Sequence, residues 1–471
     1  MQKPGNLTSV GSSGGMLVLA LVLVGAAAPS PLAAQGGVTF TKDIVPILQR
    51  SCQTCHRPDS VAPMSLITYE QVRPYARAIR QQTSLRQMPP WYIEKGVGIQ
   101  KFRNDPSLSD REIATIGKWV DAGAPMGSPA DMPAPVAFVD AATWSIGKPD
   151  LIISSPSITM DPTAPDWWGQ IGDTPTGLTE DRYVAAVETK EINDMPKGKD
   201  APKTAGGGLF VFHHSAYSVL DANGNVDPTS GFPAHEVGRN ADTFDPEAGR
   251  LLKAGSSIAF NNNHLHANGR KTKARLVLGL KLHPVGYKPK VNFRSQFFGA
   301  LEIDLKGNEA NQQMDAYYTL PSAAKIMNFE PHMHAAGVRM CLEAIWGTTV
   351  QTLNCTAYNH NWVRNYQYEE DSTPLLPKGT ILHIAGWADT TAKNQNVVDP
   401  RNWSGWGNRT VDNMFSDLAQ MVFLTDEEFK QEVEKRREKI QQGVGESIGC
   451  LLCGDARPTT ATAGRPVAEL K

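Results

Sequence analysis

Cys52, Cys55 and His56 form the run C-x-x-C-H, which is the attachment signature of a c-type haem. The spacing suits the chemistry because two thiols can add across the two vinyl groups of a haem while the adjacent imidazole binds the iron. The alternative is a disulfide or half of a zinc site, but a zinc site needs a second pair, and Cys450 and Cys453 lie at the far end of the chain. We therefore predict one covalent haem c.

Two methionines are candidates for the sixth ligand of the haem iron. Met88 lies in the run Gln-Met-Pro-Pro-Trp at 87–91, where the prolines predict a rigid turn. A thioether there would complete His/Met ligation and raise the reduction potential of the haem. Met64 is the rival, and a methionine that only fills a core is the plain alternative for either. We predict Met88.

Helices are expected on both sides of this motif. Residues 43–48 read as a short amphipathic helix before it. Ser109 and Glu112 have the spacing of a capping box, and Gly123 is a stop signal after the apolar positions that follow. Together these signals predict a small all-α cytochrome c domain over residues 36–130.

Histidine is the other residue type whose spacing points to chemistry. Six of the ten remaining histidines form three close pairs, His213 and His214, His264 and His266, and His332 and His334. The second and third pairs are each separated by one residue, so on a strand both imidazoles of a pair face the same side and can reach one metal. The first pair consists of neighbours, so both can reach one metal only if the strand bulges or ends there.

The donor types narrow the choice of metal. Imidazole suits copper, zinc, iron and nickel, whereas a thioether suits copper better than zinc. No cysteine lies beside these pairs, which argues against a structural zinc site. Four single histidines have no such setting and are given no role, namely His235, His283, His360 and His383.

Four motifs occur in one order along the chain: Phe212-His213-His214-Ser215, His264-Leu265-His266, Glu330-Pro331-His332-Met333-His334 and Val411-Asp412-Asn413-Met414. With them, residues 150–425 resemble the copper type II, ascorbate-dependent monooxygenase family, which includes peptidylglycine alpha-hydroxylating and dopamine beta-monooxygenase. The preceding part resembles the cytochrome c domains that are fused to bacterial relatives of that family. The resemblance implies two packed, jelly-roll-like β-sandwiches with one copper ion on each.

The resemblance also implies the copper ligands: His213, His214 and His264 for an electron-transfer copper, and His332, His334 and Met414 for an oxygen-activating copper. His266 is the alternative to His264, and Met421 is the nearby competitor of Met414. The implied reaction inserts one oxygen atom of dioxygen into a C–H bond of a small organic substrate, with electrons that reach the haem from an external donor. The alternatives are a non-catalytic haem and copper electron carrier and a protein that only docks a partner.

Other sequence patterns predict the strands that must position these residues and the divisions of the chain. Short apolar runs with alternating polarity, separated by turn residues, predict an all-β region after the haem part. The expected divisions are a signal peptide at 1–34, the cytochrome c domain at 36–130, a linker at 131–150, a first copper sandwich at 151–290, a second at 291–425, and a C-terminal helix and tail at 426–471.

The signal peptide predicts a periplasmic or secreted protein without a stable membrane span. Basic and acidic side chains are balanced, 46 against 48, so nothing points to a nucleic-acid partner. In an oxidising compartment we expect a disulfide between Cys341 and Cys355 across a short connection between two strands. Cys450 and Cys453 either close a small loop or stay free.

Overall fold

The chain is mostly β-sheet with few helices. The computed structural model describes residues 37–58, 60, 62, 64–137, 143–196, 210–227, 232–236, 241–409 and 411–454. The predicted signal peptide at 1–34 lies outside these residues. Two compact units are distinguished, Met1–Gly37 and Val38–Lys471, and every element described below lies in the second. None of the described helices is both long and apolar enough to cross a bilayer.

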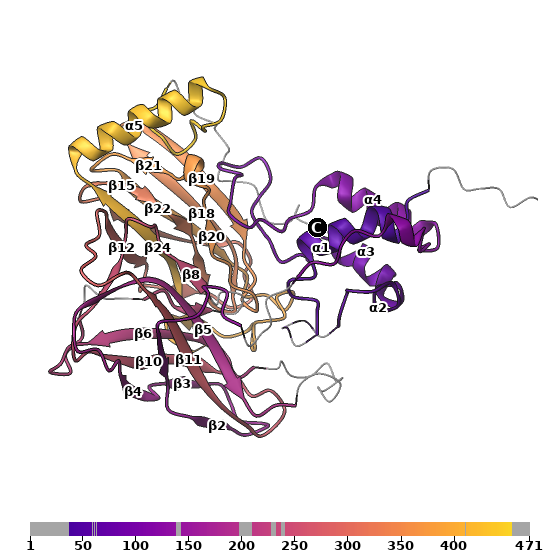
Figure 1. Cartoon of the computed structure of the whole chain (residues 1–471), viewed down its shortest axis with the longest axis horizontal. Coiled ribbons are helices and arrows are strands. Elements are labelled where there is room, and N and C mark those ends of the chain that lie inside the picture. The colour runs from indigo at the N-terminus through magenta and orange to yellow at the C-terminus, as the bar shows by residue number, and fades with distance from the viewer. Residues whose placement is uncertain are drawn as a thin grey trace, which may run out of the picture. The chain divides into compact units, whose positions relative to one another are not determined.

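A small helical part precedes the sheets (Figure 1). It contains a π-helical turn η1 (Phe40–Ile44), α1 (Val45–Ser51), α2 (Tyr69–Val72), η2 (Arg73–Tyr75), α3 (Ala76–Ser84), α4 (Asp110–Asp121) and η3 (Pro129–Asp131). The capping box at the start of α4 is confirmed, because the Ser109 hydroxyl accepts from the Glu112 amide while the Glu112 side chain accepts from the Ser109 amide. Trp119 of α4 is buried in a core of its own with Phe40 and Leu48. These short helices do not by themselves identify a cytochrome c fold.

Two antiparallel sheets follow, built from residues 151–282. Their strands are β1 (Leu151–Ser154), β2 (Ile158–Met160), β3 (Trp167–Gly169), β4 (Gly172–Pro175), β5 (Arg182–Asn193), β6 (Phe212–Leu220), β7 (His235–Glu236), β8 (Ala241–Thr243), β9 (Arg250–Leu252), β10 (Ser257–Leu265) and β11 (Thr272–Leu282). One sheet has the order β1-β11-β5-β8, with β2 on β11 and β9 on β5. The other has the order β3-β10-β6-β7, with β4 on β10, and carries His213, His214 and His264, while His266 directly follows β10.

A second group of sheets is built from residues 292–424. Its strands are β12 (Asn292–Gly299), β13 (Asp304–Leu305), β14 (Gln312–Thr319), β15 (Ala323–Ile326), β16 (Asn328–Phe329), β17 (Pro331–Met333), β18 (Gly337–Trp346), β19 (Thr349–Ala357), β20 (Tyr366–Gln367), β21 (Leu375–Leu376), β22 (Ile381–Ala388), β23 (Ser404–Gly405) and β24 (Phe415–Leu424), with a short turn η5 (Glu370–Ser372). The larger sheets have the orders β12-β24-β15-β21, with β17 on β24, and β14-β22-β18-β19. These paired sheets fit the predicted β-sandwiches.

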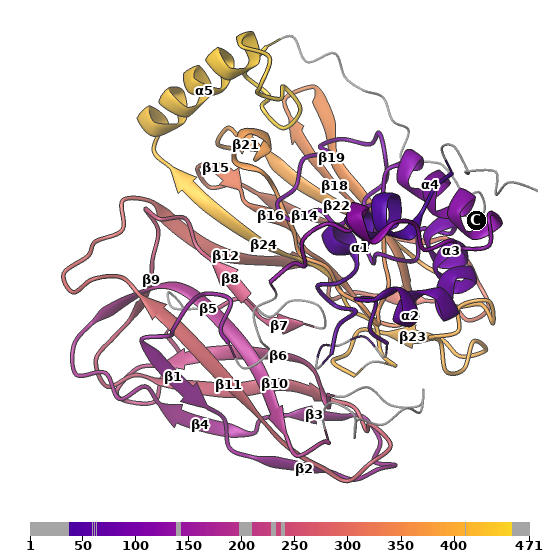
Figure 2. The same cartoon turned by 45° about the vertical axis from the view of Figure 1, so that its right-hand side comes forward.

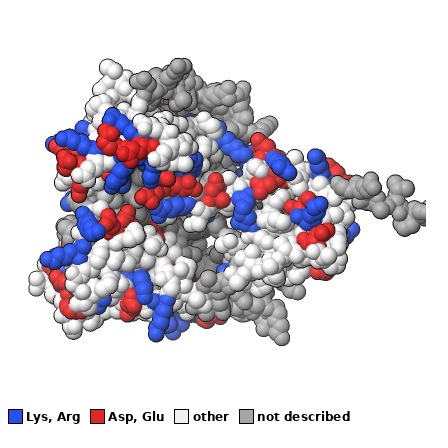
Figure 3. Space-filling model, turned by 45° about the horizontal axis from the view of Figure 1, so that its top comes forward, with Lys and Arg blue, Asp and Glu red and all other residues white. Residues whose placement is uncertain are grey.

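Helix α5 (Asp426–Gln441) spans the stretch for which the sequence predicts a charged helix. Figure 2 shows it beside β15 and β21, which it contacts. Its apolar side chains Phe429 and Val433 join a buried core. Figure 3 shows that Lys and Arg side chains are interspersed with Asp and Glu on the face drawn there.

Residues 91–103 lie between α3 and α4 in the chain and pack against the second group of sheets, and we call this segment the strap. Its Trp91, Ile99 and Phe102 are buried in the core of those sheets. The Ile99 amide donates to the Leu353 carbonyl of β19 at 2.9 Å. Because Gly98 has a φ of +61° and a Cβ there would lie 2.0 Å from that same carbonyl oxygen, only glycine fits this crossing.

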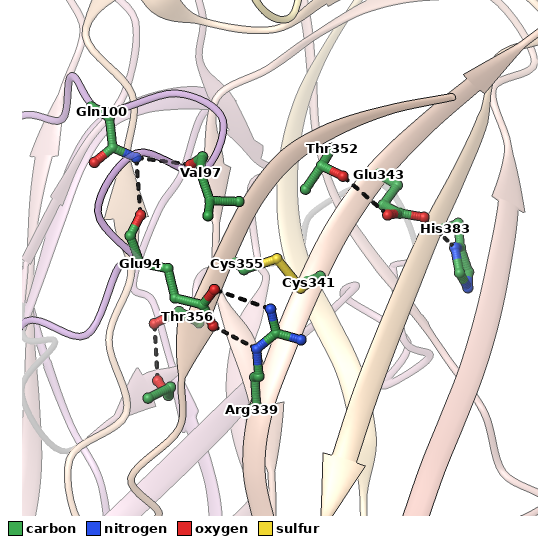
Figure 4. The surroundings of a disulfide bond; sticks show 11 residues. Glu94, Val97, Gln100, Arg339, Cys341, Glu343, Thr352, Cys355, Thr356 and His383 are labelled. Atoms are coloured by element: carbon green, nitrogen blue, oxygen red, sulfur yellow. Dashed lines mark hydrogen bonds and ion pairs between the residues drawn. A yellow bond between two sulfur atoms is a disulfide. The ribbon is translucent and has the colours of Figure 1, made fainter. Parts of the chain in front are cut away.

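The disulfide between Cys341 and Cys355 is confirmed and lies beside the strap (Figure 4). It joins directly opposed residues of β18 and β19. Glu94 of the strap binds Arg339 of β18 through two contacts, one of them 3.0 Å from Nη2 to Oε2. Cys450 and Cys453, which the sequence left open, are also bonded to each other. The strap and the first disulfide therefore fix the same two strands.

Candidate metal centre

The first predicted ligand set lies on two neighbouring strands. His213 and His214 are on β6, and His264 lies opposite His214 on β10. The register shifts after this pair, because Leu265 opposes Phe212, so His213 is the extra residue of a β-bulge. The bulge supplies the irregularity that two neighbouring histidines need if both are to face one point. One ring nitrogen from each of the three lies within 4.8 Å of the others, and all three side chains are buried.

An acidic side chain extends this set toward His266. The Asp166 carboxylate lies 3.3 Å from Nε2 of His264 and 3.8 Å from Nδ1 of His266. These three residues form a second group with ligand atoms close enough for one ion. The His264 side chain is 1% exposed and the His266 side chain 35% exposed. His264 is thus common to both groups, whereas His266 lies at the outer edge.

The second predicted set lies where β17 ends. His332 opposes Ser416 and Met333 opposes Phe415 across β17 and β24. His334 directly follows β17 and Met414 directly precedes β24, so both lie at the same end of this paired segment. Met333 is buried in the core, so the two flanking histidines face the other side, as the spacing of one residue predicts. The ring centroids of His332 and His334 are 5.6 Å apart.

Met421, the competitor of Met414, has a different environment. It lies in the middle of β24, opposite Ile326 of β15, and is buried in the apolar core. Met414 is only half-buried and directly precedes β24. Of the two thioethers, the structure therefore brings Met414 to the end of the sheet where His334 lies.

The two sets are neighbours in one continuous cluster of imidazoles. The rings of His214 and His332 have centroids 5.7 Å apart. His360, which the sequence treats as a single histidine, lies 5.0 Å from the His213 ring and 6.0 Å from the His334 ring by the same measure. It reaches the cluster from the loop between β19 and β20, far from the other pairs in sequence, so no local spacing could have revealed it.

A buried carboxylate, also missed from the sequence, adjoins the second set. Glu236 lies on β7, opposite His214 of β6. Its Oε1 is 3.4 Å from Nδ1 of His332, an approach without hydrogen-bond alignment. A carboxylate behind a ligating imidazole commonly fixes the orientation of that ring. The only sequence signal was a histidine beside a glutamate at 235 and 236.

Burial and mutual proximity lower the pKa of four imidazoles of the cluster. Burial, followed by the neighbouring rings, lowers the pKa of His213 and of His214 well below the ordinary value. The same causes lower the pKa of His334 to about 2 and that of His360 to about 4. Neutral imidazoles have a free lone pair, so protons do not compete with a metal at neutral pH.

The cluster also contains buried nitrogen atoms without partners. Nδ1 of His214 makes no hydrogen bond to any residue that the structure describes, and the ring nitrogens of His334 and His360 lack a well-aligned one, although the backbones of Asp412 and Met333 are close enough to oppose the lowering of their pKa values. Buried polar atoms without partners are rare in folded proteins. Nitrogen donors without a thiolate beside them, and with one thioether at the edge, are a donor set that fits copper better than structural zinc.

The haem-attachment motif forms a tight turn after α1. The His56 amide donates to the Cys52 carbonyl at 2.9 Å, and both cysteine thiols are free. Burial raises the pKa of Cys52 to about 12 and also raises that of Cys55. Nδ1 of His56 lies 3.2 Å from the Met64 carbonyl, an arrangement that leaves Nε2 for an iron atom. These residues fit a covalent haem.

The sixth ligand is less well positioned. Met64 contacts the haem motif through its backbone, because its carbonyl lies 3.2 Å from Nδ1 of His56. Met88 is 43% exposed and lines a cavity of about 290 Å³ together with Trp91 and Phe102. The lining of that cavity does not include the haem motif, and ligation of the iron by Met88 stays a prediction.

A half-buried arginine, Arg364, is close to Trp91 of the strap and near enough to the haem motif to affect Cys55. The Arg364 guanidinium is stacked 5.2 Å from the centre of the Trp91 ring. It is the cation that most lowers the pKa of the Cys55 thiol, an effect smaller than the opposing effect of burial. Its Nε has no hydrogen-bond partner in the described part of the chain. An anionic group of a haem would supply such a partner.

Comparisons with known proteins do not identify a family. No family model matches the chain. No curated protein matches it either. Among solved structures, the major capsid protein P2 of bacteriophage PM2 aligns with 56% of this chain and 99% of its own, at 9% identity and a TM-score of 0.29. The turret protein A223 of Sulfolobus turreted icosahedral virus aligns with 58% and 98%, at 8% identity and a TM-score of 0.13. Likenesses this weak carry no argument about function.

Proposed function

We propose that this chain is an exported copper monooxygenase that draws its electrons from a covalent haem c in the same polypeptide. We infer that it is a member of the copper type II, ascorbate-dependent monooxygenase family, with the two groups of sheets as jelly-roll-like sandwiches and residues 36–130 as a cytochrome c domain. The observation that carries the proposal is the gathering of histidines from four separate segments into one cluster.

The proposed ligands are the two predicted sets. His213, His214 and His264 would hold an electron-transfer copper, and His332, His334 and Met414 an oxygen-activating copper. Copper and haem, when bound, supply the one-electron chemistry in which a C–H bond, dioxygen, two electrons and two protons become a C–OH group and water. The weak thioether leaves a labile position for an exchangeable small molecule.

The protein residues around the ligands have defined tasks in this proposal. The Glu236 carboxylate, 3.4 Å from Nδ1 of His332, would form its hydrogen bond to that nitrogen when Nε2 binds the metal. Trp168 packs its ring 4.6 Å from that of His214 and keeps water from that side of the first set. Burial lowers the pKa of His213, His214 and His334, so these three rings would bind metal without a proton being displaced.

The proposed compartment follows from the same features. The predicted signal peptide directs the chain across the membrane, and two disulfides fit an oxidising environment such as the periplasm or the exterior. The proposed partners are dioxygen, a small organic substrate and an external electron donor to the haem.

A second candidate is a non-catalytic haem and copper electron carrier. It is favoured by the deep burial of the cluster and by the 5.7 Å separation of the His214 and His332 rings, because closely spaced, enclosed metals suit electron transfer. Transfer of label from ¹⁸O₂ into a product distinguishes the two candidates. A carrier gives no labelled product with any substrate of a broad screen.

The first test is cofactor analysis with transient kinetics on the full chain. We expect one haem and two coppers per chain, and a copper-dependent loss of ferrous haem absorbance after mixing with oxygen. His334→Ala should abolish that copper dependence, whereas His383→Gln, which lies outside the cluster, should preserve it. A chain without bound copper, or haem oxidation that is equally fast without copper, contradicts the proposal.

A further inference from the structure

Asp166 and His266 lie at one edge of the histidine cluster, outside both proposed copper sets. Asp166 directly precedes β3, and His266 directly follows β10. The last pair between these two antiparallel strands is Trp167 with Leu265, so Asp166 and His266 lie at the same end of the sheet. The end of this sheet therefore brings a carboxylate and an imidazole together.

With His264 these two residues form a complete set of three donors, which we call the outer set. The Asp166 carboxylate is 3.3 Å from Nε2 of His264 through one oxygen and 3.8 Å from Nδ1 of His266 through the other. One ligand atom from each of the three residues lies within 4.8 Å of the others. Two imidazoles and a carboxylate are a donor set that suits a divalent ion such as Cu(II).

The outer set is more exposed than the first copper set. The side chains of Asp166 and His266 are 39% and 35% exposed, whereas those of the first set are all buried. An ion that enters a buried site directly must lose its water before the protein ligands replace it, which is costly. A partly exposed set can hold the ion while some of its water remains, so it divides this cost into two steps.

The outer set also adjoins the first copper set. The His266 ring lies 4.5 Å from that of His264 and 4.6 Å from that of His213, measured between centroids. Rings within the first set are 5.1 to 5.5 Å apart by the same measure. An ion in the outer set is therefore already beside the first set.

His264 belongs to both sets, so they cannot be filled at the same time. An imidazole that binds a metal offers the lone pair of one nitrogen while the other nitrogen keeps its proton. We propose that Asp166, His264 and His266 form an entry site, where Cu(II) binds before it passes to His213, His214 and His264. This inference rests on the proposed copper function.

The rival role of Asp166 is that of a hydrogen-bond partner that only orients the His264 ring. The two roles differ in their kinetics. An entry site lies on the path in both directions, so its loss slows copper loading and copper release by the same factor. Loss of an orienting contact weakens the filled site, which speeds release and leaves loading unchanged.

Stopped-flow mixing of the full chain with Cu(II) tests the inference without any turnover. His334→Ala is the background, because it disables the second copper set. The Trp168 ring lies 4.6 Å from that of His214 and 5.3 Å from that of His264, so quenching of tryptophan fluorescence reports on copper in the first set. In this background His266→Gln and Asp166→Asn should each slow loading about 10-fold. Release to a chelator should slow by the same factor.

The chain offers a matched control in a second pair of histidine and aspartate. Nε2 of His383 and Oδ1 of Asp315 are 2.9 Å apart, outside the cluster. His383→Gln and Asp315→Asn should change neither rate. His266→Gln is the decisive variant, because it removes a ligand without removing a carboxylate charge that attracts the ion. Circular dichroism of the copper-free chains shows that each variant is folded.

The outcomes separate two failures. If neither the wild-type chain nor the background binds copper, the proposed function fails together with this inference. If both bind copper and His266→Gln loads at the rate of the background, the outer set is not an entry site and only this inference is overturned. The same conclusion follows if the variants release copper faster while loading is unchanged, or if Asp166→Asn alone slows loading and added salt abolishes its effect.

Discussion

The buried state of His360 predicts a specific dependence of stability on pH in the copper-free protein. Its pKa is lowered to about 4 in the folded chain, first by burial and then by the neighbouring imidazoles. In the unfolded chain the pKa returns to about 6.5. Between these values the unfolded state binds the proton and the folded state does not, so stability is fully present above pH 6.5 and is lost as the pH falls toward 4.

The magnitude follows from the two pKa values. At pH 5 the difference in proton binding lowers the free energy of unfolding by about 2 kcal/mol relative to pH 8. The slope around pH 5.25 is about 1.2 kcal/mol per pH unit, close to one proton. In His360→Phe this contribution is removed, so the free energy of unfolding should fall by about 2 kcal/mol less than in the wild type over the same range.

Urea unfolding of the copper-free chain, followed by far-ultraviolet circular dichroism at pH 8, 6.5 and 5, measures this difference. His383→Gln is a control of opposite sign. Burial lowers the pKa of His383, but its hydrogen bonds to Glu343 and Asp315 outweigh burial and raise the pKa overall. The stabilisation by His383 is fully present at pH values below its pKa in the unfolded chain, and it is lost as the pH rises through its higher pKa in the folded chain. Equal slopes for the wild type and His360→Phe would refute the burial argument.

Three further predictions concern the strap and the haem motif. Glu94→Gln should lower the free energy of unfolding by about 2–4 kcal/mol in urea titrations, because it leaves the buried Arg339 without its carboxylate; no loss would contradict that pairing. Gly98→Ala should release the strap, with faster proteolytic cleavage there, because of its positive φ and the adjacent backbone oxygen. Arg364→Met should raise the pKa of Cys55 in the haem-free chain, measured as slower alkylation at fixed pH; unchanged kinetics would separate the two residues.

The features that the sequence predicted correctly depend on residues that are close together in the chain or on neighbouring strands. The capping box of Ser109 and Glu112 and the disulfide of Cys341 and Cys355 depend on residues that are close in the chain or face each other across a short connection. The pairing of His332 with His334 on one side of a strand follows from the two-residue period. Mostly β structure was likewise predictable from alternating polarity.

The parts that were missed depend on packing between distant segments. His360 reaches the cluster only because Tyr92, more than two hundred residues earlier, holds its loop. Glu236 gains its place by pairing of β7 with β6. The adjacency of the two histidine sets was not foreseen either, because it depends on how two groups of sheets meet. The spacing of residues along a chain does not predict how distant sheets pack against each other.

The strap has a consequence for anyone who dissects this chain. Trp91, Ile99 and Phe102 fill positions inside the second group of sheets although they precede all of its strands in sequence. A fragment that begins at the predicted linker would therefore lose three large apolar side chains from its interior and leave a void. The cut that preserves an intact β part lies before residue 91, within the region that the sequence assigns to the haem. The domain boundary predicted from the sequence therefore differs from the boundary that the packing of the strap sets for the β part.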